Sequence, residues 1–395
     1  MAEKREVVIV SAVRTAIGTF GGTLKDFSSS QLGTVAVKEA IARAKIDVAQ
    51  IGHLVCGNVI HGEARDMYVS RAIALDAGMV KESSALTLNR LCGSGLQAIV
   101  TAANAIQLGD TDAAIGCGVE TMSRSGYLAP AMRFGARMGE TKMIDMMIGA
   151  LTDPFSLNHM GITAENVAAQ FGISRDDQDK FALESQRRAA AAIDAGYFKS
   201  QIVPVEIQTR KGTTLFDTDE HPKRDTTMES LAKLRAAFKK DGTVTAGNAS
   251  GINDGAAAVV LMEATAAAKA GAKPLARLVS YAVAGVEPSI MGTGPIPAVR
   301  LALKRAGLQV ADIDVIESNE AFAAQACSVN KELGLDTAKV NPNGGAVALG
   351  HPLGATGAIL TVKCLYELAR TNKRYGLVTM CIGGGQGIAA IFERI

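Results

Sequence analysis

Two stretches of the chain carry apolar residues at helical spacing and align with one another without a gap. The first covers residues 37–51 and reads VKEAIARAKIDVAQI; the second covers residues 299–313 and reads VRLALKRAGLQVADI. Each pattern predicts an amphipathic helix, a short turn and entry into an apolar strand, which continues through residues 53–56 in one case and 315–318 in the other. Chance similarity between two Ala-rich helices would not extend through the turn and the strand entry. We therefore predict an internal repeat.

A second pair of patterns follows in the same order in both halves. The sequence CGSG at residues 92–95 precedes a helical pattern, and a short apolar run then ends at residues 117–118. Near the C-terminus, HPLG at residues 351–354 precedes another helical pattern, and the apolar run LVTM then ends at Cys381. The apolar faces comprise Leu96, Ile99, Val100, Ala103 and Ile106 in the first helix and Ala358, Val362, Leu365 and Ala369 in the second. Such alternation predicts a layered α/β fold, with two halves facing each other across a shared site.

The middle of the chain, from about residue 121 to 247, interrupts the repeat. It holds a Met-rich segment at residues 132–147 and a long predicted helix that starts at Ser174, with Asp177 placed to satisfy backbone donors and Gly196 at its end. A charged stretch at residues 209–240 follows, which we expect to be irregular. We interpret this region as an insertion over one half, where substrate specificity is often determined.

Composition narrows the possible partners and compartments. The 395 residues are 48% hydrophobic and carry 41 basic and 39 acidic side chains, so no global basic field favours nucleic acid as a partner, although a local cluster can hold a phosphate-bearing ligand. No run approaches the roughly 20 apolar residues of a membrane span. Residues 1–5 lead directly into an apolar strand without a signal-like segment, and the six Cys form no CxxC pair. We expect a cytoplasmic protein with free thiols, no disulfide framework and no metal site.

Cys92 is the first candidate for chemistry. It lies in NRLCGSG at residues 89–95, immediately before a predicted helix. The partial positive charge and free N–H groups of a helix N-terminus favour a thiolate, so we expect the Cys92 pKa to fall below the unperturbed value of ~8.5. A buried Cys that acts as a small apolar residue fits this segment equally well.

His351 lies in NGGAVALGHPLG at residues 343–354, a stretch too rich in Gly for a regular strand or helix. The following Pro restricts the backbone, which suggests a positioned imidazole. The alternative is a structural His that bonds to nearby backbone.

Two further residues stand at predicted strand ends. Cys381 begins CIGGGQG, where a Gly-rich loop offers N–H groups for an anion or an oxyanion hole. A tight turn is the alternative, and the loop lacks the Lys-Ser/Thr ending of a nucleoside triphosphate site. Asn319 can hold a water or an imidazole, although on its own a turn residue is the more natural interpretation. Together these residues indicate a nucleophile, a base and a second acid/base where two half-sites meet.

The whole chain resembles the thiolases, specifically the short-chain biosynthetic acetyl-CoA acetyltransferases and β-ketothiolases. Five motifs in the family's order carry the resemblance: NRLCGSG at Cys92, GNASGINDGAAA at residues 247–258, NEAFA at Asn319, GHPLGATG at His351 and CIGGGQG at Cys381. The resemblance implies the α/β thiolase fold, with two pseudo-symmetric βαβαβαββ halves in a five-layered α-β-α-β-α arrangement. It assigns residues 1–121 plus about 248–271 to the N-terminal half, 122–247 to an inserted loop domain for substrate binding and oligomerisation, and 272–395 to the C-terminal half. It also implies a homotetramer built as a dimer of dimers.

The resemblance implies a ping-pong reaction between acyl-CoA molecules. Cys92, activated by His351, takes the acyl group; Cys381 then removes a proton from a second acetyl-CoA, whose carbanion attacks the acylated Cys92. One oxyanion is stabilised by His351 and a water on Asn319, and the other by the backbone N–H groups of Cys92 and Gly383. The product is a short-chain 3-ketoacyl-CoA, and thiolysis is the reverse.

Coenzyme A enters as a substrate, and the resemblance implies no permanently bound cofactor. It places Ser250 near the pantetheine amide and Lys223 where the family has an Arg at the adenine and phosphate end; an ammonium does not stack as a guanidinium does. His159, Met160 and Met291 border the acyl pocket. The remaining assigned contacts are Ala246, Gly247, Phe238, Ala321 and Phe322, with Arg224 beside Lys223.

Two other functions are alternatives to a thiolase. A decarboxylating β-ketoacyl synthase uses Cys with two His, or with His and Asn, whereas the third position here is Cys381. A non-catalytic acyl-CoA-binding relative has no need of Cys92, His351 and Cys381 together.

Overall fold

The computed structural model describes residues 5–395; residues 1–4, part of the N-terminal segment considered above, lie outside it. Its main sheet has eleven strands, nine of them in the order β13-β14-β15-β12-β1-β11-β5-β3-β4. In the N-terminal half these are β1 (Val7–Thr15), β11 (Asn253–Glu263), β5 (Ala113–Thr121), β3 (Ile51–Gly57) and β4 (Ser84–Leu88). In the C-terminal half they are β12 (Ala276–Gly285), β15 (Gln386–Arg394), β14 (Tyr375–Ile382) and β13 (Val315–Ser318). The short strands β2 (Gly18–Thr19) and β8 (Ile202–Val203) pair with β11 and β1.

The two halves repeat one topology. In the N-terminal half, β1 pairs antiparallel with β11, β11 antiparallel with β5, and β5 parallel with β3. In the C-terminal half, β12 pairs antiparallel with β15, β15 antiparallel with β14, and β14 parallel with β13. The register of β1 on β11 shifts between Ile9 and Ser11, and that of β12 on β15 shifts between Leu278 and Ser280. β-Bulges are specific features of a fold rather than random defects, so their presence at matching positions confirms the internal repeat. The halves join where β1 pairs antiparallel with β12.

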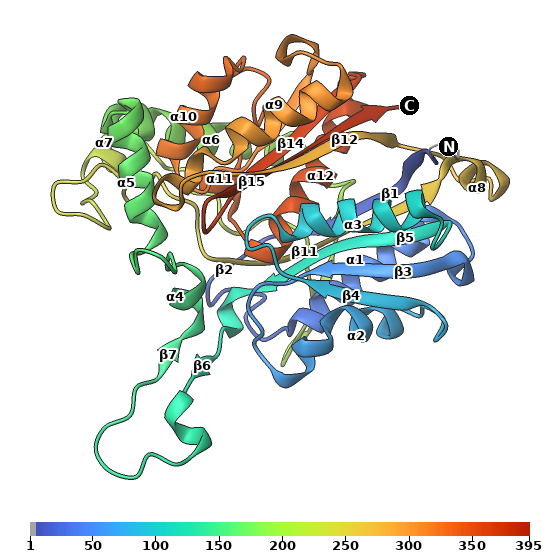
Figure 1. Cartoon of the computed structure of the whole chain (residues 1–395), viewed down its shortest axis with the longest axis horizontal. Helices are drawn as coiled ribbons and strands as arrows, with labels where there is room; N and C mark the ends of the chain where they lie inside the picture. The colour runs from blue at the N-terminus through green and yellow to red at the C-terminus, as the bar shows by residue number, and fades with distance from the viewer. Residues whose placement is uncertain (1–4) are drawn as a thin grey trace.

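Helices separate and cover the strands in five layers (Figure 1). α3 (Ser94–Leu108) and α12 (Leu353–Arg370) form the central layer, and their apolar side chains share one core with strands of both halves. α1 (Ser29–Ala44) and α2 (Val69–Asp76) cover the outer face of the N-terminal half, while α9 (Pro295–Ala306) and α10 (Ala323–Leu333) cover the C-terminal half. Two short helices, α8 (Ala264–Lys269) and α11 (Ala346–Leu349), lie in connections. The expected α-β-α-β-α order is therefore present.

Glycines bring the two central helices into backbone contact. A Cβ on Gly95 of α3 would lie 2.7 Å from the Ala358 nitrogen of α12, and a Cβ on Gly357 would collide with the Leu96 nitrogen. Any larger residue would force the helices apart. Because Gly95 follows Cys92 by three residues and Gly357 follows His351 by six, this contact brings the N-terminal ends of both helices together.

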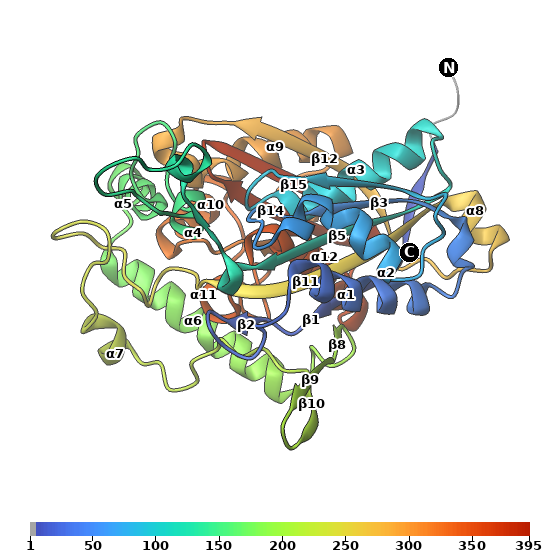
Figure 2. The ribbon, with the colours of Figure 1, turned by 90° about the horizontal axis from the view of Figure 1, so that it is seen from below.

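The middle region contacts both halves: helices α5 and α6 pack against α10 of the C-terminal half, whereas β8 and β9 pack on the sheet and core of the N-terminal half. The long helix α6 runs beside a small hairpin (Figure 2). Ser174 caps α6 in a capping box with Asp177, and Gly196 takes a φ of +73° beyond its end, so the predicted helix is confirmed. The expectation that residues 209–240 are irregular is wrong in part, because backbone pairing creates the β9–β10 hairpin and Thr227 caps α7. The elements are β6 (Tyr127–Leu128), β7 (Ile144–Asp145), α4 (Met146–Ala150), α5 (Met160–Phe171), α6 (Arg175–Asp194), β9 (Val205–Thr209), β10 (Gly212–Phe216) and α7 (Met228–Ala232).

The segment that joins β6 to β7 extends well away from the body (Figure 1). Phe134 and Met138 on it are 91% and 96% exposed. Large apolar side chains this exposed usually mark a surface that binds another molecule. Among residues 5–395, no helix is both long and apolar enough to cross a membrane.

One buried ion pair ties this middle region to the N-terminal half. Arg14 donates to Asp219 through two nitrogens, at 2.7 and 2.9 Å, and both side chains are fully buried. We expect Asp219→Asn to lower the free energy of unfolding by about 3–5 kcal/mol, because the Arg14 charge would stay buried without its counter-ion. Denaturant unfolding measures this, with Asp194→Asn as the control: Asp194 pairs with Arg224 on the exposed surface, where a loss below about 0.5 kcal/mol is expected. Equal losses in the two variants would contradict the prediction.

Candidate active site

The turn that presents Cys92 is strained. Leu91 adopts a φ of +45°, a region that residues other than glycine rarely enter. The Ser94 hydroxyl holds the turn by accepting from the Arg90 N–H at 2.8 Å and donating to the Leu91 carbonyl at 2.7 Å, while Asn89 accepts from the Leu91 N–H. Strain of this kind persists only where the surroundings enforce it, and it is concentrated at functional sites.

The Cys381 loop packs directly on this turn. A Cβ on Gly93 would lie 2.7 Å from Ile382, and a Cβ on Gly383 would lie 2.9 Å from Leu91. The backbone N–H groups of Gly383 and of Cys92 itself act to lower the pKa of the Cys92 thiol, and Cys92 in turn raises the pKa of Cys381, so these groups lie close to one another. The two thiols and the two N–H groups named from the sequence therefore meet in one place.

The expected lowering of the Cys92 pKa is wrong. Burial of the thiol group raises its pKa to about 11, even though the Cys92 residue as a whole is only half-buried, and the N–H groups of Gly383 and Cys92 oppose that rise. Burial dominates because the turn lies between the Cys381 loop and an apolar cluster that includes Ile60, Met122 and Leu353. Burial likewise raises the pKa of Cys381. Both thiols are therefore protonated at neutral pH, and attack requires a base.

This pKa predicts how the free enzyme reacts with an alkylating agent. We expect the rate of iodoacetamide modification at Cys92 to rise about tenfold per pH unit between pH 7 and 9, because the reactive thiolate is a small and growing fraction there. Peptide mass mapping after timed quenching measures the rate at Cys92 alone. A rate already constant from pH 7 would contradict the raised pKa.

His351 is buried and its ring nitrogens have distinct partners. Nδ1 lies 2.6 Å from the Thr356 hydroxyl, which itself donates to the Pro352 carbonyl at 2.9 Å. A hydroxyl has one proton, so Thr356 accepts from Nδ1–H, and Nε2 carries the lone pair. Burial lowers the pKa of His351 to about 4, so the ring is neutral at pH 7. His351 therefore presents an unprotonated Nε2, which is the form that a base needs.

Asn319 lies beside that nitrogen. Its Nδ2 is 3.4 Å from His351 Nε2, and its backbone N–H donates to Thr379, two residues before Cys381. Its Oδ1 is buried and receives no hydrogen bond from residues 5–395. The contact between α3 and α12 and the pairing of β13 with β14 bring the elements that carry Cys92 and Cys381 toward this Asn319–His351 pair.

Six of the residues assigned to coenzyme A form one continuous wall beside Cys381. His159 stacks on Phe238 with ring centroids 4.6 Å apart, and Phe238 meets the edge of Phe322 at 6.1 Å. The Ser250 N–H donates to the Ala321 carbonyl at 3.0 Å. Met160 belongs to the same apolar cluster as Cys381, Ala321, Phe322 and Met291.

The other three assigned residues, Lys223, Ala246 and Gly247, line a cavity of about 270 Å³. Arg224 does not line it, because its guanidinium pairs with Asp194 on the exposed surface. His221, which sequence reasoning missed, also borders the cavity; burial and the Lys223 charge lower its pKa to about 4. Lys223 is the cationic side chain among the residues that line the cavity, and the Asp225 carboxylate lines it as well.

Sequence reasoning also missed three supports of His351. Thr356 accepts from His351 Nδ1 and so keeps the ring proton on that nitrogen, and Asn253 accepts from the His351 backbone N–H at 2.9 Å. Glu120, on the opposite half, accepts from the N–H groups of Gly354 and Ile60 at 2.7 and 3.0 Å, although burial raises its pKa to about 8. Their positions in the sequence could have identified them. Thr356 and Asn253 lie inside the quoted motifs, and Glu120 is a single acidic residue near the end of an apolar strand. Among residues 5–395, no group of three or more His, Cys, Asp or Glu is placed to hold a metal ion.

Comparisons with known proteins find relatives over the whole length of the chain. Residues 7–265 match the family described as "Thiolase, N-terminal domain", and residues 272–394 match "Thiolase, C-terminal domain". The β-ketothiolase BktB of Cupriavidus necator is 65% identical over 392 residues, covering 99% of this chain and 100% of that protein. An acetyl-CoA acetyltransferase of Escherichia coli K12 is 51% identical over 393 residues, covering 99% and 100%.

Solved structures show the same fold. Human mitochondrial 3-ketoacyl-CoA thiolase superposes with a TM-score of 0.98 at 45% identity, with all of both chains covered. A structure described as that thiolase in complex with CoA superposes with a TM-score of 0.96 at 45% identity, covering 100% of this chain and 99% of that one. On its matched domains, its fold and its close relatives, the chain belongs to the thiolase family.

Proposed function

We propose that this chain is an acetyl-CoA C-acetyltransferase, or β-ketothiolase, which reversibly condenses two acyl-CoA molecules into a short-chain 3-ketoacyl-CoA and free CoA. The observation that supports this most directly is the meeting of two thiols, Cys92 and Cys381, with a neutral imidazole whose Nε2 is unprotonated. A transferase that must both carry an acyl group and create a carbon nucleophile needs two such groups.

In the first half-reaction, Cys92 Sγ attacks the thioester carbonyl as its proton passes to His351 Nε2. The backbone N–H groups of Cys92 and Gly383 stabilise the oxyanion, and a side chain at position 383 would collide with Leu91 and Met160. The proton then moves to the leaving CoA thiolate. The products are acyl-Cys92 and neutral CoA thiol.

In the second half-reaction, one proton remains for Cys381 and His351 to share. It moves from Cys381 to Nε2, so that the Cys381 thiolate can abstract a methyl proton of acetyl-CoA while the imidazolium and Asn319 stabilise the enolate oxygen. The carbanion attacks the acyl carbon, and Cys92 leaves as a thiolate. Cys92 recovers its proton from His351, and Cys381 keeps the one taken from the substrate. The Nδ1–H to Thr356 bond is kept throughout, which fixes the ring while Nε2 changes state.

We also propose the assembly and location that the resemblance implies. Residues 122–247 serve as the loop domain, and the exposed apolar side chains between β6 and β7 suit a contact between dimers. The open edge at β4, with Leu86 partly exposed, suits the contact within a dimer. A homotetramer is consistent with both surfaces. A cytoplasmic location is consistent with the chemistry, because Cys92 and Cys381 must stay reduced to act.

A mass measurement tests the function directly. Incubation with acetyl-CoA should add one acetyl group to the protein, and peptide mapping should place it on Cys92. Absence of the adduct, with CoA still bound, would instead support a non-catalytic acyl-CoA-binding relative. Turnover of acetoacetyl-, 3-ketovaleryl- and 3-ketohexanoyl-CoA would then measure how much chain the pocket at Met160 and Met291 accepts.

A further inference from the structure

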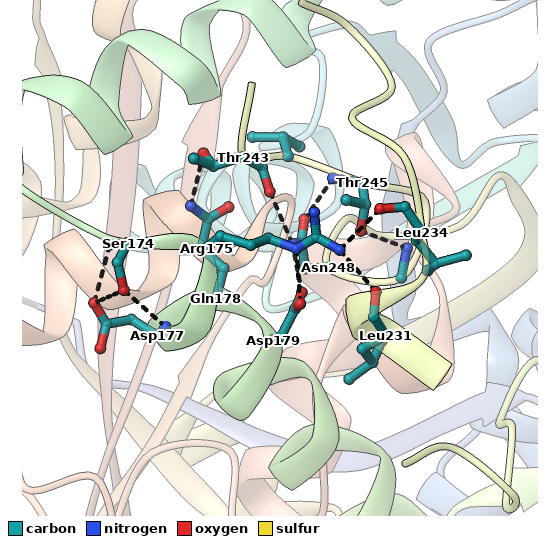
Figure 3. A network of polar contacts seen from close by, with 12 residues as sticks. Ser174, Arg175, Asp177, Gln178, Asp179, Leu231, Leu234, Thr243, Thr245 and Asn248 are labelled. Atoms are coloured by element: carbon teal, nitrogen blue, oxygen red, sulfur yellow. Dashed lines mark hydrogen bonds and ion pairs between the residues drawn. The ribbon is translucent and has the colours of Figure 1, made fainter. Parts of the chain in front are cut away.

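A network of polar contacts links the start of α6 to the end of α7 and to the loop that holds Asn248 (Figure 3). Leu231 and Leu234 of this network also line the cavity that Lys223 borders. The centre of the network is Arg175, the first residue of α6. One terminal nitrogen of Arg175 donates to the carbonyls of Leu231 at 2.7 Å and Leu234 at 3.0 Å, where α7 ends. The Leu231 carbonyl also accepts from the Leu234 N–H at 3.0 Å, so Arg175 adds a second, charged donor to the turn that ends α7.

The network continues from Arg175 to the opposite wall. Arg175 Nε donates to Asp179 at 2.7 Å, and the other oxygen of Asp179 accepts from Asn248 Nδ2 at 2.9 Å. Asn248 also donates to the Thr243 carbonyl at 3.1 Å and accepts from the Thr245 N–H at 2.8 Å. Asp179 and Asn248 are 2% and 0% exposed, so these bonds are shielded from water. They determine the path of the loop that continues to Ser250.

The two ends of this network are two walls of one cavity. Leu231 and Leu234 line it from α7, while Ala246 and Gly247 line it from the loop. The walls touch at Gly247, where a Cβ would lie 2.5 Å from Leu234 and 2.6 Å from Leu231. Because Arg175 holds one wall directly and the other through Asp179 and Asn248, it sets the distance between them.

We propose that Arg175 is a positioning residue for the nucleotide end of coenzyme A, acting through the walls of this cavity rather than on the reacting groups. The inference rests on the proposed function and deepens it. Arg175 contacts none of Cys92, His351 and Cys381, and Lys223 at the cavity supplies the charge for phosphate. Loss of Arg175 therefore weakens recognition of the nucleotide and leaves the chemistry at Cys92 intact.

The test compares thioesters with and without the nucleotide. For Arg175→Gln we expect the KM for acetyl-CoA to rise about tenfold, as for a lost network of charge-assisted hydrogen bonds, with kcat changed less than about twofold. With acetyl-pantetheine, which lacks the nucleotide, kcat/KM should change less than about twofold. Titration calorimetry should show the same selective loss for CoA against pantetheine. Arg187→Gln is the matched control, since Arg187 lies on the same helix and, within residues 5–395, pairs with Glu184 alone on the exposed face.

A second variant tests the route through the network. Asp179→Asn keeps an acceptor for Asn248 and removes the charge that holds Arg175, so the KM of this variant for acetyl-CoA should rise. When Arg175→Gln and Asp179→Asn are combined, the rise in KM should be smaller than the product of the two single rises. Equal losses with both thioesters would show a general structural role and overturn the inference, as would an unchanged KM for acetyl-CoA. An inactive wild-type protein would overturn the proposed function instead.

Discussion

Replacing Cys381 by Ala is expected to separate the two half-reactions. Cys92 and His351 remain, so acetyl-CoA should still acetylate Cys92, while condensation to acetoacetyl-CoA should fall by about 10⁴-fold, the upper range for loss of a general base. The physical reason is that Cys381 is the thiol whose loop packs directly on the Cys92 turn, so its loss leaves the second acetyl-CoA without the base that we propose. Single-turnover mass spectrometry follows acetylation, and absorbance of the 3-ketoacyl-CoA enolate follows condensation.

Cys327→Ala is the control for this experiment. Cys327 is also a free thiol with a burial-raised pKa of about 12, and it packs against the same apolar cluster as Cys381. It lies on α10, however, and the Cys92 charge does not reach it. Its replacement should leave both half-reactions within about twofold of wild type. Normal condensation by Cys381→Ala would mean that another group takes the proton.

Replacing His351 by Ala is expected to slow acylation of Cys92 by at least about 10³-fold, because a thiol with a pKa of about 11 then has no acceptor for its proton. Condensation should fall too, since the enolate loses its Nε2 donor. Rapid-quench acylation with acetyl-CoA measures the first loss. A variant that acylates at the wild-type rate would remove His351 from the first step.

The His351 pKa also predicts the pH dependence of acylation in the wild-type enzyme. The active form pairs a protonated Cys92 with a neutral His351, so it predominates between their pKa values of about 4 and about 11. Acylation should therefore be nearly constant from about pH 5.5 to 9 and fall at lower pH as Nε2 becomes protonated. A profile that falls through pH 6.5 would indicate an ordinary imidazole.

Thr356→Val, which removes the acceptor of Nδ1–H, should slow acylation, and Thr356→Ser should restore it.

Local patterns in the sequence were sufficient for the repeated helix and strand units, and they singled out the groups that we propose to react. Apolar periodicity predicted the helix-turn-strand units at residues 37–51 and 299–313, and Ser174 with Asp177 marked the start of α6. Cys92, His351 and Cys381 stood out because Gly-rich segments flank each of them. These features depend on neighbours within a few residues, which is the range over which helix capping and periodicity act.

Only the tertiary structure decided the electrostatics and the supports of the site. A helix N-terminus predicted a lowered Cys92 pKa, but burial under the Cys381 loop reversed the sign. Lys223 rather than Arg224 lines the cavity because Asp194, about thirty residues earlier in the chain, engages Arg224. Glu120 and Arg175 gained their roles from partners that are distant in the chain. Burial and hydrogen-bond partners are set by which distant segments meet, and no local pattern in the chain encodes that choice.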